Sequence, residues 1–129
     1  MMENKIENKN VYLSSPKLLY HDPIFDRACK YIRSQNPHLF VEPSNMFATN
    51  AEWRDAFPGY LMGFDVCVIV AQEDYMVGRG VFLEWTYFRD AEKKVYYFSD
   101  NNKLAKLVPV KDIQVIDDDD WIEYAQVIL

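Results

Sequence analysis

The sequence predicts an α/β domain in which helices cover both faces of a mostly parallel sheet of four to five strands. Residues 65–71 (Asp-Val-Cys-Val-Ile-Val-Ala) form a short, valine-rich apolar run, which is typical of a strand buried in the middle of a sheet. Further short strands alternate with stretches of helical periodicity, and this alternation favours right-handed crossovers between parallel strands. We therefore expect a single three-layer α/β/α sandwich, Rossmann- or flavodoxin-like.

The expected strands are short runs that end at a proline or at polar loop residues. They cover residues 11–14, 38–41, 66–71, 93–98, 107–110 and 113–116. The run at 66–71 is expected at the centre of the sheet and parallel to the run at 11–14. Pro109 restricts its strand to an edge, because proline has no N–H group to donate within a sheet. A polar loop is expected between residue 71 and Gly78.

Two helices are expected in the first half of the chain. Asp22-Pro23 is typical of a helix start, and an apolar stripe follows it to about Arg33. Thr49 and Glu52 match a capping box, so a second helix is expected through residues 53–56. Both helices end where proline interrupts the pattern.

Two more helices are expected in the second half. The first carries Glu84, and its apolar residues Val81, Trp85 and Phe88 recur at the spacing of one buried face. The acidic residues 117–120 are expected to open the last helix, because acids stabilise a helix N-terminus. A metal site at residues 117–120 is the alternative interpretation.

Composition bounds the class of protein. The chain has 129 residues, which suits one domain: we expect a flexible tail over residues 1–10 and the domain over residues 11–129. Half of the residues are apolar, which indicates a globular chain. The net charge of −6 argues against nucleic-acid and anionic-membrane partners, since both need a concentrated positive surface.

The remaining sequence signals favour a cytoplasmic protein. The N-terminal residues lack the apolar segment of a signal peptide, and no apolar run approaches the length of a membrane span. Cys29 and Cys67 fall in apolar patterns without CxxC spacing, so we expect buried thiols in a reducing compartment. His21 and His38 lack the spacing of a zinc site, and we expect neither a metal nor a cofactor.

Glu84 is the strongest candidate for a functional residue. It is expected about one turn into its helix, past the carboxyl end of the central strand, where open α/β sheets bind their ligands. An acid between Leu83 and Trp85 in an apolar helix must either face a cleft or have a partner. A paired carboxylate with a purely structural role is the alternative.

Several motifs in order resemble the nucleoside 2-deoxyribosyltransferase superfamily, in particular its nucleotide N-glycoside hydrolase branch. Residues 11–16 (Val-Tyr-Leu-Ser-Ser-Pro) resemble the family's first strand and turn. Residues 80–84 (Gly-Val-Phe-Leu-Glu) are similar to its Gly-Val/Thr-x-x-Glu signature, and residues 93–98 follow where the family has its next strand. Arg54-Asp55 resembles the family's acidic residue on the preceding helix, with a spacing to the central strand about two residues longer.

The resemblance implies cleavage or transfer at the N-glycosidic bond of a nucleotide or nucleoside. Glu84 would act as the nucleophile or stabilise the oxocarbenium-like transition state. Asp55 would donate a proton to the leaving base. Tyr12 would hydrogen-bond Glu84 and fix its rotamer.

Other residues are expected to bind the substrate without reacting. The family has Asp or Ser six residues before the glutamate, where this chain has Gly78, so a non-catalytic nucleotide-binding or sensor module is the alternative function. Arg79 and free N–H groups at the helix start favour an anionic group, and hence a nucleotide over a nucleoside. The candidate binding residues are Ser14, Ser15, Pro16, Gly78, Arg79, Gly80 and Val81.

A homodimer or a higher homo-oligomer is also expected. Large aromatic residues are abundant and hard to bury in one small core, and exposed apolar patches usually mark contacts between chains. Those concerned are Trp53, Tyr60, Phe64, Trp85, Tyr87, Phe88, Trp121 and Tyr124. The resemblance implies the same, because family members assemble and complete one another's pockets. An interaction protein with a vestigial cleft is the third interpretation.

Overall fold

The computed structural model describes residues 5–15, 23–41, 52, 55–70, 76–77, 79–100, 105–110 and 114–115. These residues form an α/β fold with a five-stranded sheet and two α-helices. The elements are β1 (Asn10–Ser14), α1 (Pro23–Ser34), β2 (Leu39–Val41), the 3-10 helix η3 (Gly59–Leu61), β3 (Val66–Ile69), β4 (Met76–Val77), α3 (Arg79–Asp90), β5 (Lys94–Ser99), β6 (Lys106–Pro109) and β7 (Gln114–Val115).

The main sheet has the strand order β2-β1-β3-β5-β6, with β3 at its centre. β3 pairs in parallel with β1, where Tyr12 lies opposite Cys67, and in parallel with β5. β2 is also parallel to β1, whereas β6 is antiparallel to β5. The prediction of a mostly parallel sheet with the valine-rich strand at its centre is therefore confirmed. Pro109 lies in the edge strand β6, as its missing N–H group requires.

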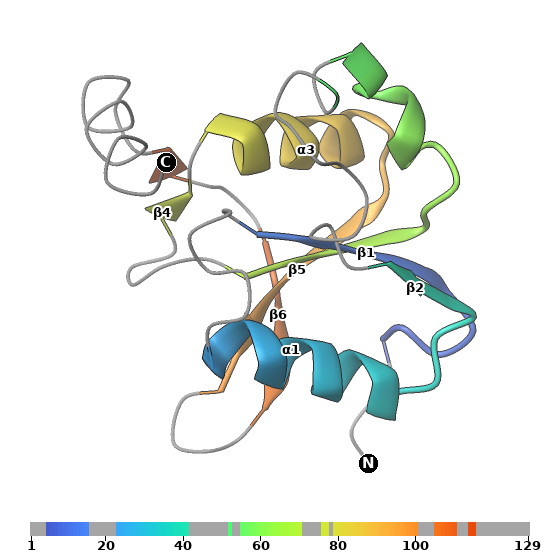
Figure 1. The fold of residues 1–129 in the computed structure, drawn as a ribbon, viewed down its shortest axis with the longest axis vertical. Helices are drawn as coiled ribbons and strands as arrows, with labels where there is room; N and C mark the ends of the chain where they lie inside the picture. The colour runs from blue at the N-terminus through green and yellow to red at the C-terminus, as the bar shows by residue number, and fades with distance from the viewer. Residues whose placement is uncertain are drawn as a thin grey trace.

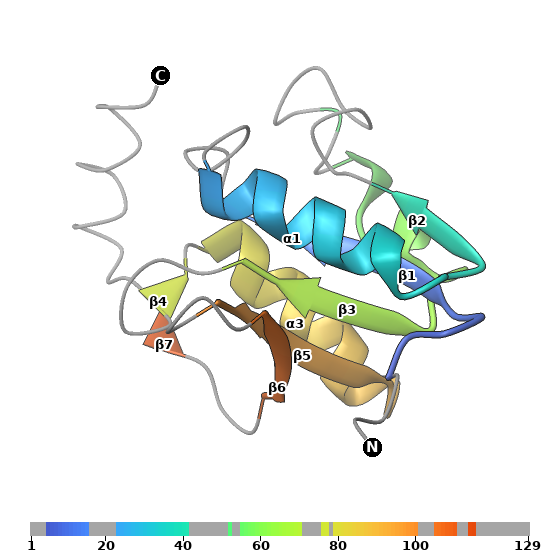
Figure 2. The ribbon, with the colours of Figure 1, turned by 90° about the horizontal axis from the view of Figure 1, so that it is seen from below.

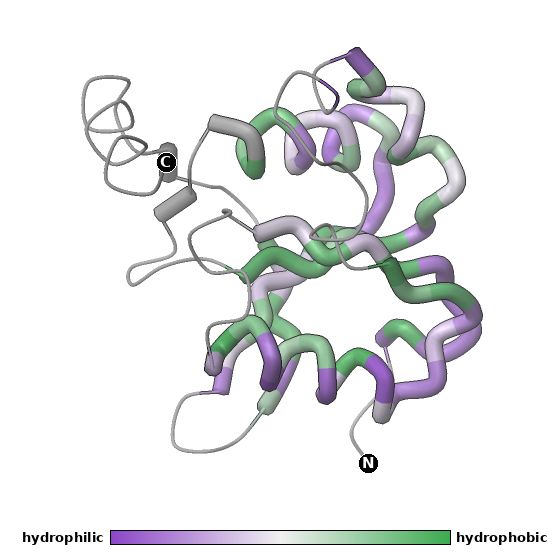
Figure 3. Tube along the Cα trace, viewed as in Figure 1, coloured by the Kyte–Doolittle hydropathy of each residue, from purple (hydrophilic) through white to green (hydrophobic). Residues whose placement is uncertain are grey.

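The two helices lie on opposite faces of this sheet (Figures 1 and 2). α1 begins at Pro23 and buries the predicted apolar stripe, Phe25, Ala28, Cys29 and Ile32. It is followed by Asn36, whose left-handed backbone (φ 57°) asparagine tolerates better than most residues. Colouring by hydropathy shows α1 as an alternation of hydrophobic and hydrophilic segments, consistent with a helix that has one buried face (Figure 3).

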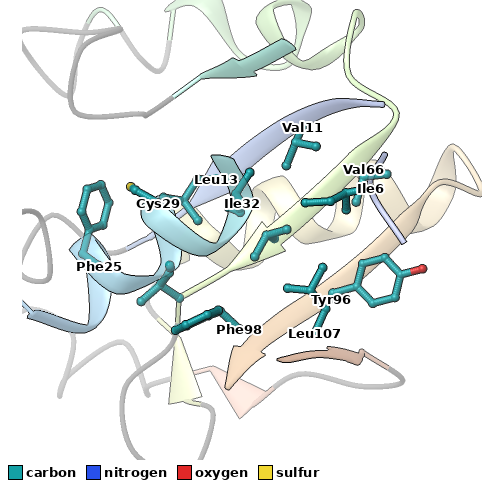
Figure 4. Close-up of a cluster of buried hydrophobic side chains, with 13 residues drawn as sticks. Ile6, Val11, Leu13, Phe25, Cys29, Ile32, Val66, Tyr96, Phe98 and Leu107 are labelled. Atoms are coloured by element: carbon teal, nitrogen blue, oxygen red, sulfur yellow. The ribbon is translucent and has the colours of Figure 1, made fainter. Parts of the chain in front are cut away.

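Successive strand residues contribute to two separate cores, because side chains alternate between the faces of a sheet. The α1 face is a continuous apolar core, and Figure 4 shows Leu13 near Ile32 of α1 and Val66 near Ile6. The α3 face is built from the intervening residues, among them Cys67. Val81, Trp85 and Phe88 of α3 pack against this face. This confirms the predicted buried face of that helix.

Several expected boundaries are wrong. Residues 5–10 do not form a tail: Ile6 is fully buried in the α1-face core and Asn10 begins β1, because one apolar residue in a polar stretch is enough to dock it. The loop expected after residue 71 contains β4, which pairs in parallel with β7 in a separate two-stranded sheet.

Residues 52, 55 and 56 are helical, while the proposed cap Thr49 and residues 117–129 lie outside the described residues.

The expectation that the large aromatic residues are too many to bury within one chain is wrong for three of them. Phe64, Trp85 and Phe88 are buried within the chain itself, so these three residues need no partner chain to remove them from water. Tyr60 and Tyr87 are half-buried. Trp53, Trp121 and Tyr124 lie outside the described residues. The oligomeric state therefore stays a prediction.

No helix in the described part of the chain combines the length and the apolar character that crossing a membrane requires.

A candidate active site around Glu84

Glu84 is buried on the side of α3 that faces the sheet, with 4% of its surface exposed. Its neighbours on this side of the helix, Val81, Trp85 and Phe88, are apolar. An ionised carboxylate in such surroundings is strongly destabilising unless hydrogen-bond donors replace the water that it loses. The fold supplies these donors.

At least three hydroxyl groups donate hydrogen bonds to the Glu84 carboxylate. Tyr12 Oη lies 2.5 Å from Oε2, and Ser14 Oγ lies 2.7 Å from Oε1. Tyr60 Oη donates to Oε2 as well. Each donor is an O–H group, and an ionised carboxylate accepts hydrogen bonds without donating any, so this arrangement suits the charged form. The predicted hydrogen bond from Tyr12 to Glu84 is confirmed.

Tyr12 and Ser14 reach Glu84 together because they are two residues apart on β1 and therefore lie on the same face of the sheet. Strand pairing with β2 on one side and β3 on the other fixes the backbone of Tyr12. Its ring packs against Phe64 and Phe88, with centroids 5.4 and 6.5 Å away. Both donors are thus held rigidly by the sheet and the core.

Tyr60 reaches the same carboxylate from outside the sheet. It lies in η3, where the backbone N–H groups of Leu61 and Met62 donate to the carbonyls of Pro58 and Gly59. The Lys93 ammonium donates to the carbonyl of Phe64 at 2.7 Å and to that of Met62 at 3.3 Å, which ties the end of this segment to the region after α3. Tyr60 was not among the site residues predicted from the sequence. The only local signal is the preceding Pro58-Gly59 turn.

Cys67 lies on the same face of the sheet, opposite Tyr12 in the strand register. Complete burial raises the pKa of its thiol well above the ordinary value, and the negative charge of Glu84 raises that pKa further. The thiol is therefore protonated at neutral pH and is a poor nucleophile there. Both cysteines are buried and free, as the sequence predicted.

The structure brings some of the predicted site residues together and leaves others apart. Glu84, Tyr12 and Ser14 come together, although the hydroxyl of Ser14 donates to Glu84, whereas the sequence suggested a bond to a ligand. Ser15 and Val81 are also buried; Ser15 follows Ser14 directly, and Val81 precedes Glu84 in α3. Asp55 is exposed on the helical segment before η3.

The remaining candidates lie at the start of α3 and after β1. Arg79 and Gly80 are the first two residues of α3, as predicted for a helix N-terminus next to Gly78. Gly78 and Pro16 lie outside the described residues. Among the described residues, no cluster of three or more His, Cys, Asp or Glu side chains could hold a metal ion.

Comparison of the chain with protein-family models, with curated proteins and with solved structures finds no match.

Proposed function

We propose that this protein cleaves or transfers at the N-glycosidic bond of a nucleotide or nucleoside, on a Rossmann-like three-layer α/β/α domain, with Glu84 as the catalytic carboxylate. The observation that supports this most is the buried carboxylate of Glu84, held by the hydroxyls of Tyr12, Ser14 and Tyr60. Burial of a charged group against so many apolar neighbours costs stability, and such groups cluster at functional sites. The motif resemblance gives the reaction class.

The proposed chemistry uses the charge of Glu84. As the bond between the anomeric carbon and the base breaks, its electron pair leaves with the base and positive charge develops on the sugar ring. A fixed carboxylate attracts this charge more strongly than it attracts the neutral substrate, so it lowers the barrier. The anomeric carbon then bonds to an oxygen of water or to a second base, either directly or after a covalent intermediate on Glu84.

The departing base needs a proton, which Asp55 is proposed to donate. Asp55 is exposed on the helical segment before η3. The proposal therefore requires the bound substrate to cover Asp55, because a proton is transferred only to a base that lies within hydrogen-bond reach of the carboxyl group. Asp55→Asn should lower base release without changing the unfolding free energy by more than about 0.5 kcal/mol, because the residue lies at the surface.

Arg79 at the first position of α3 supports a nucleotide over a nucleoside. A cation next to the free N–H groups of a helix N-terminus favours an anionic group such as a phosphate. A homodimer or higher homo-oligomer is part of the same proposal, since family members complete one another's pockets.

The test is to incubate the protein with a panel of nucleosides and nucleotides and to measure free base, comparing wild type with Glu84→Gln. The glutamine can keep the hydrogen bonds: its oxygen accepts from Tyr12 and Tyr60, and its amide group donates to Ser14, whose hydroxyl rotates to accept. Only the charge is lost. We expect base release to fall by about 10²-fold or more, with the fold retained.

Glu92→Gln is the matched control, because it makes the same chemical change at an exposed glutamate just after α3. It should leave base release at the wild-type rate. Base release by Glu84→Gln at the wild-type rate would remove Glu84 from the reaction. No base release by wild type from any member of the panel would contradict the enzymatic function.

A non-catalytic nucleotide-binding or sensor module is the second candidate. One observation favours it: Tyr12 and Tyr60 both donate to Oε2, which leaves that oxygen poorly placed to attack carbon. The replacement of the family's Asp or Ser by Gly78 points the same way. This function predicts a ligand-induced rise in melting temperature without release of base, because a ligand that binds the native state stabilises it.

A further inference from the structure

We propose that Tyr60 is a specificity-determining residue that occupies the position of a sugar hydroxyl on Glu84 and leaves when the ligand binds. This inference rests on the proposed function, since it takes the ligand to carry a sugar. The inference goes beyond that function because it names Tyr60 as the group that the ligand displaces and a sugar hydroxyl as the ligand group that takes its place. Three features of the Glu84 environment support it.

The first is a difference in burial among the donors. Tyr12 and Ser14 are 1% and 0% exposed and belong to a strand paired on both sides. Tyr60 is half-buried, and its hydrogen bond to Glu84 is only partly enclosed. A ligand arriving from solvent therefore meets Tyr60 before it meets the other two hydroxyls.

The second is the number of lone pairs on Oε2. A carboxylate oxygen has two lone pairs in its plane, and each accepts one hydrogen bond well. Tyr12 and Tyr60 both donate to Oε2. A ligand that uses this oxygen must displace one of them, and burial leaves Tyr60 as the one that can go.

The third is how the Tyr60 segment is held. Lys93 fixes the carbonyls of Met62 and Phe64, and the N–H groups of Leu61 and Met62 are bonded within η3. These bonds anchor the backbone on either side of the side chain. Rotation of the Tyr60 side chain about its Cα–Cβ bond moves the hydroxyl away from Glu84 without breaking any of them. The displacement therefore needs a rotamer change and no loop unfolding.

The chemistry of the vacated position defines the ligand group. The position offers a negatively charged acceptor, so it accepts a hydroxyl donor and repels an anion. A ring hydroxyl of a pentose fits, and its hydrogen bond replaces that of Tyr60 with an equivalent one. A phosphate on the same ligand has to lie elsewhere.

The experiment compares the binding of 2-deoxyribose 5-phosphate to wild type, Tyr60→Phe and Tyr12→Phe by titration calorimetry. This probe has no base, so it binds without reacting. Removal of the Tyr60 hydroxyl removes the competitor for Oε2, and a hydrogen bond to a charged group corresponds to about a tenfold change in affinity or more. We expect Tyr60→Phe to bind about tenfold tighter than wild type. Tyr12→Phe should not gain affinity, because its position is closed to the ligand.

A second probe, 2,3-dideoxyribose 5-phosphate, isolates the hydroxyl. In a 2-deoxynucleotide the anomeric carbon carries the base, so the ring hydroxyl that competes with Tyr60 is the 3-hydroxyl, which this probe lacks. Tyr60→Phe should therefore bind it no more tightly than wild type does. A weaker or unchanged affinity of Tyr60→Phe for the deoxyribose probe overturns the inference, because it makes Tyr60 a residue that the bound state needs. Absence of binding to both wild type and Tyr60→Phe overturns it as well. Failure of the proposed function gives a different result. The deoxyribose probe then binds more tightly to Tyr60→Phe than to wild type, but no base is released from any nucleoside or nucleotide.

Discussion

The two faces of the central sheet use the same strands for different purposes. Towards α1, β1 contributes Val11 and Leu13, and the buried side chains of this core are hydrophobic. Towards α3, the same strand contributes Tyr12 and Ser14, whose hydroxyls bind a buried acid. The period of two along a strand separates these roles residue by residue.

Because of this difference, mutations on the α1 face should mainly lower the stability of the fold, whereas mutations on the α3 face should mainly affect the proposed chemistry. Apolar contacts on the α1 face stabilise the fold because they remove surface from water and pack closely. Shortening a side chain there therefore lowers the unfolding free energy. On the α3 face the buried charge of Glu84 opposes stability, and its three hydroxyl donors offset that cost. Variants on the two faces should therefore differ in what they change.

The largest effect on stability is expected on the α1 face. Phe25→Ala removes a fully buried ring from α1 and leaves a cavity against the sheet, so the unfolding free energy should fall by about 3–5 kcal/mol. Urea-induced unfolding measures it. Lys30→Ala, at an exposed position of the same helix, should stay within about 0.5 kcal/mol of wild type. A loss below about 1 kcal/mol for Phe25→Ala would contradict the tight packing of this face.

A smaller effect is expected from the hydrogen bonds on the α3 face. Tyr12→Phe removes a donor to a charged acceptor without leaving a cavity, so the unfolding free energy should fall by about 1.5–3 kcal/mol. In the Glu84→Gln background the same change should cost at least about 1 kcal/mol less, because the acceptor is then neutral. Strictly additive effects in this double-mutant cycle would show that the two side chains are not coupled.

The next effect is a pH dependence of the unfolding free energy that arises from Cys67 on the α3 face. Burial and the charge of Glu84 raise the pKa of Cys67, so the thiol contributes no loss of stability below the pKa of the unfolded thiol, about 8.5. Above that pH the unfolded chain releases a proton that the folded chain keeps, and stability falls. Relative to Cys67→Ala, wild type should lose about 1.4 kcal/mol per pH unit between roughly pH 9 and 10. Parallel pH profiles of the two proteins would refute this.

The smallest effect is expected outside both cores. Arg27 of α1 forms an ion pair with Asp100, and their side chains are 54% and 22% exposed. Exposed ion pairs contribute little because water and salt screen them, so Arg27→Ala should lower the unfolding free energy by less than about 1 kcal/mol. The loss should shrink further at 1 M salt. A larger, salt-independent loss would mean that Arg27 packs against the core through its apolar stem.

Local patterns in the sequence determined most of the sheet and the helices α1 and α3. The valine-rich run predicted the central strand, and the spacing of Val81, Trp85 and Phe88 predicted the buried face of α3. Glu84 stood out because it is an acid on that face, and its hydrogen bond from Tyr12 followed from placing β1 next to β3. These features depend on the periodicity of strands and helices, which a few neighbouring residues suffice to set. The reaction class remains a prediction from the resemblance.

Tertiary structure alone decided the rest of the site. Tyr60 is 24 residues from Glu84 in sequence, and their contact depends on the path of η3 and on the bonds from Lys93 that hold it. Likewise, the burial of Ile6 and the pairing of β4 with β7 join segments that are weakly patterned on their own. Such contacts depend on where distant parts of the chain meet after the core has formed. No local pattern in the sequence encodes that meeting point.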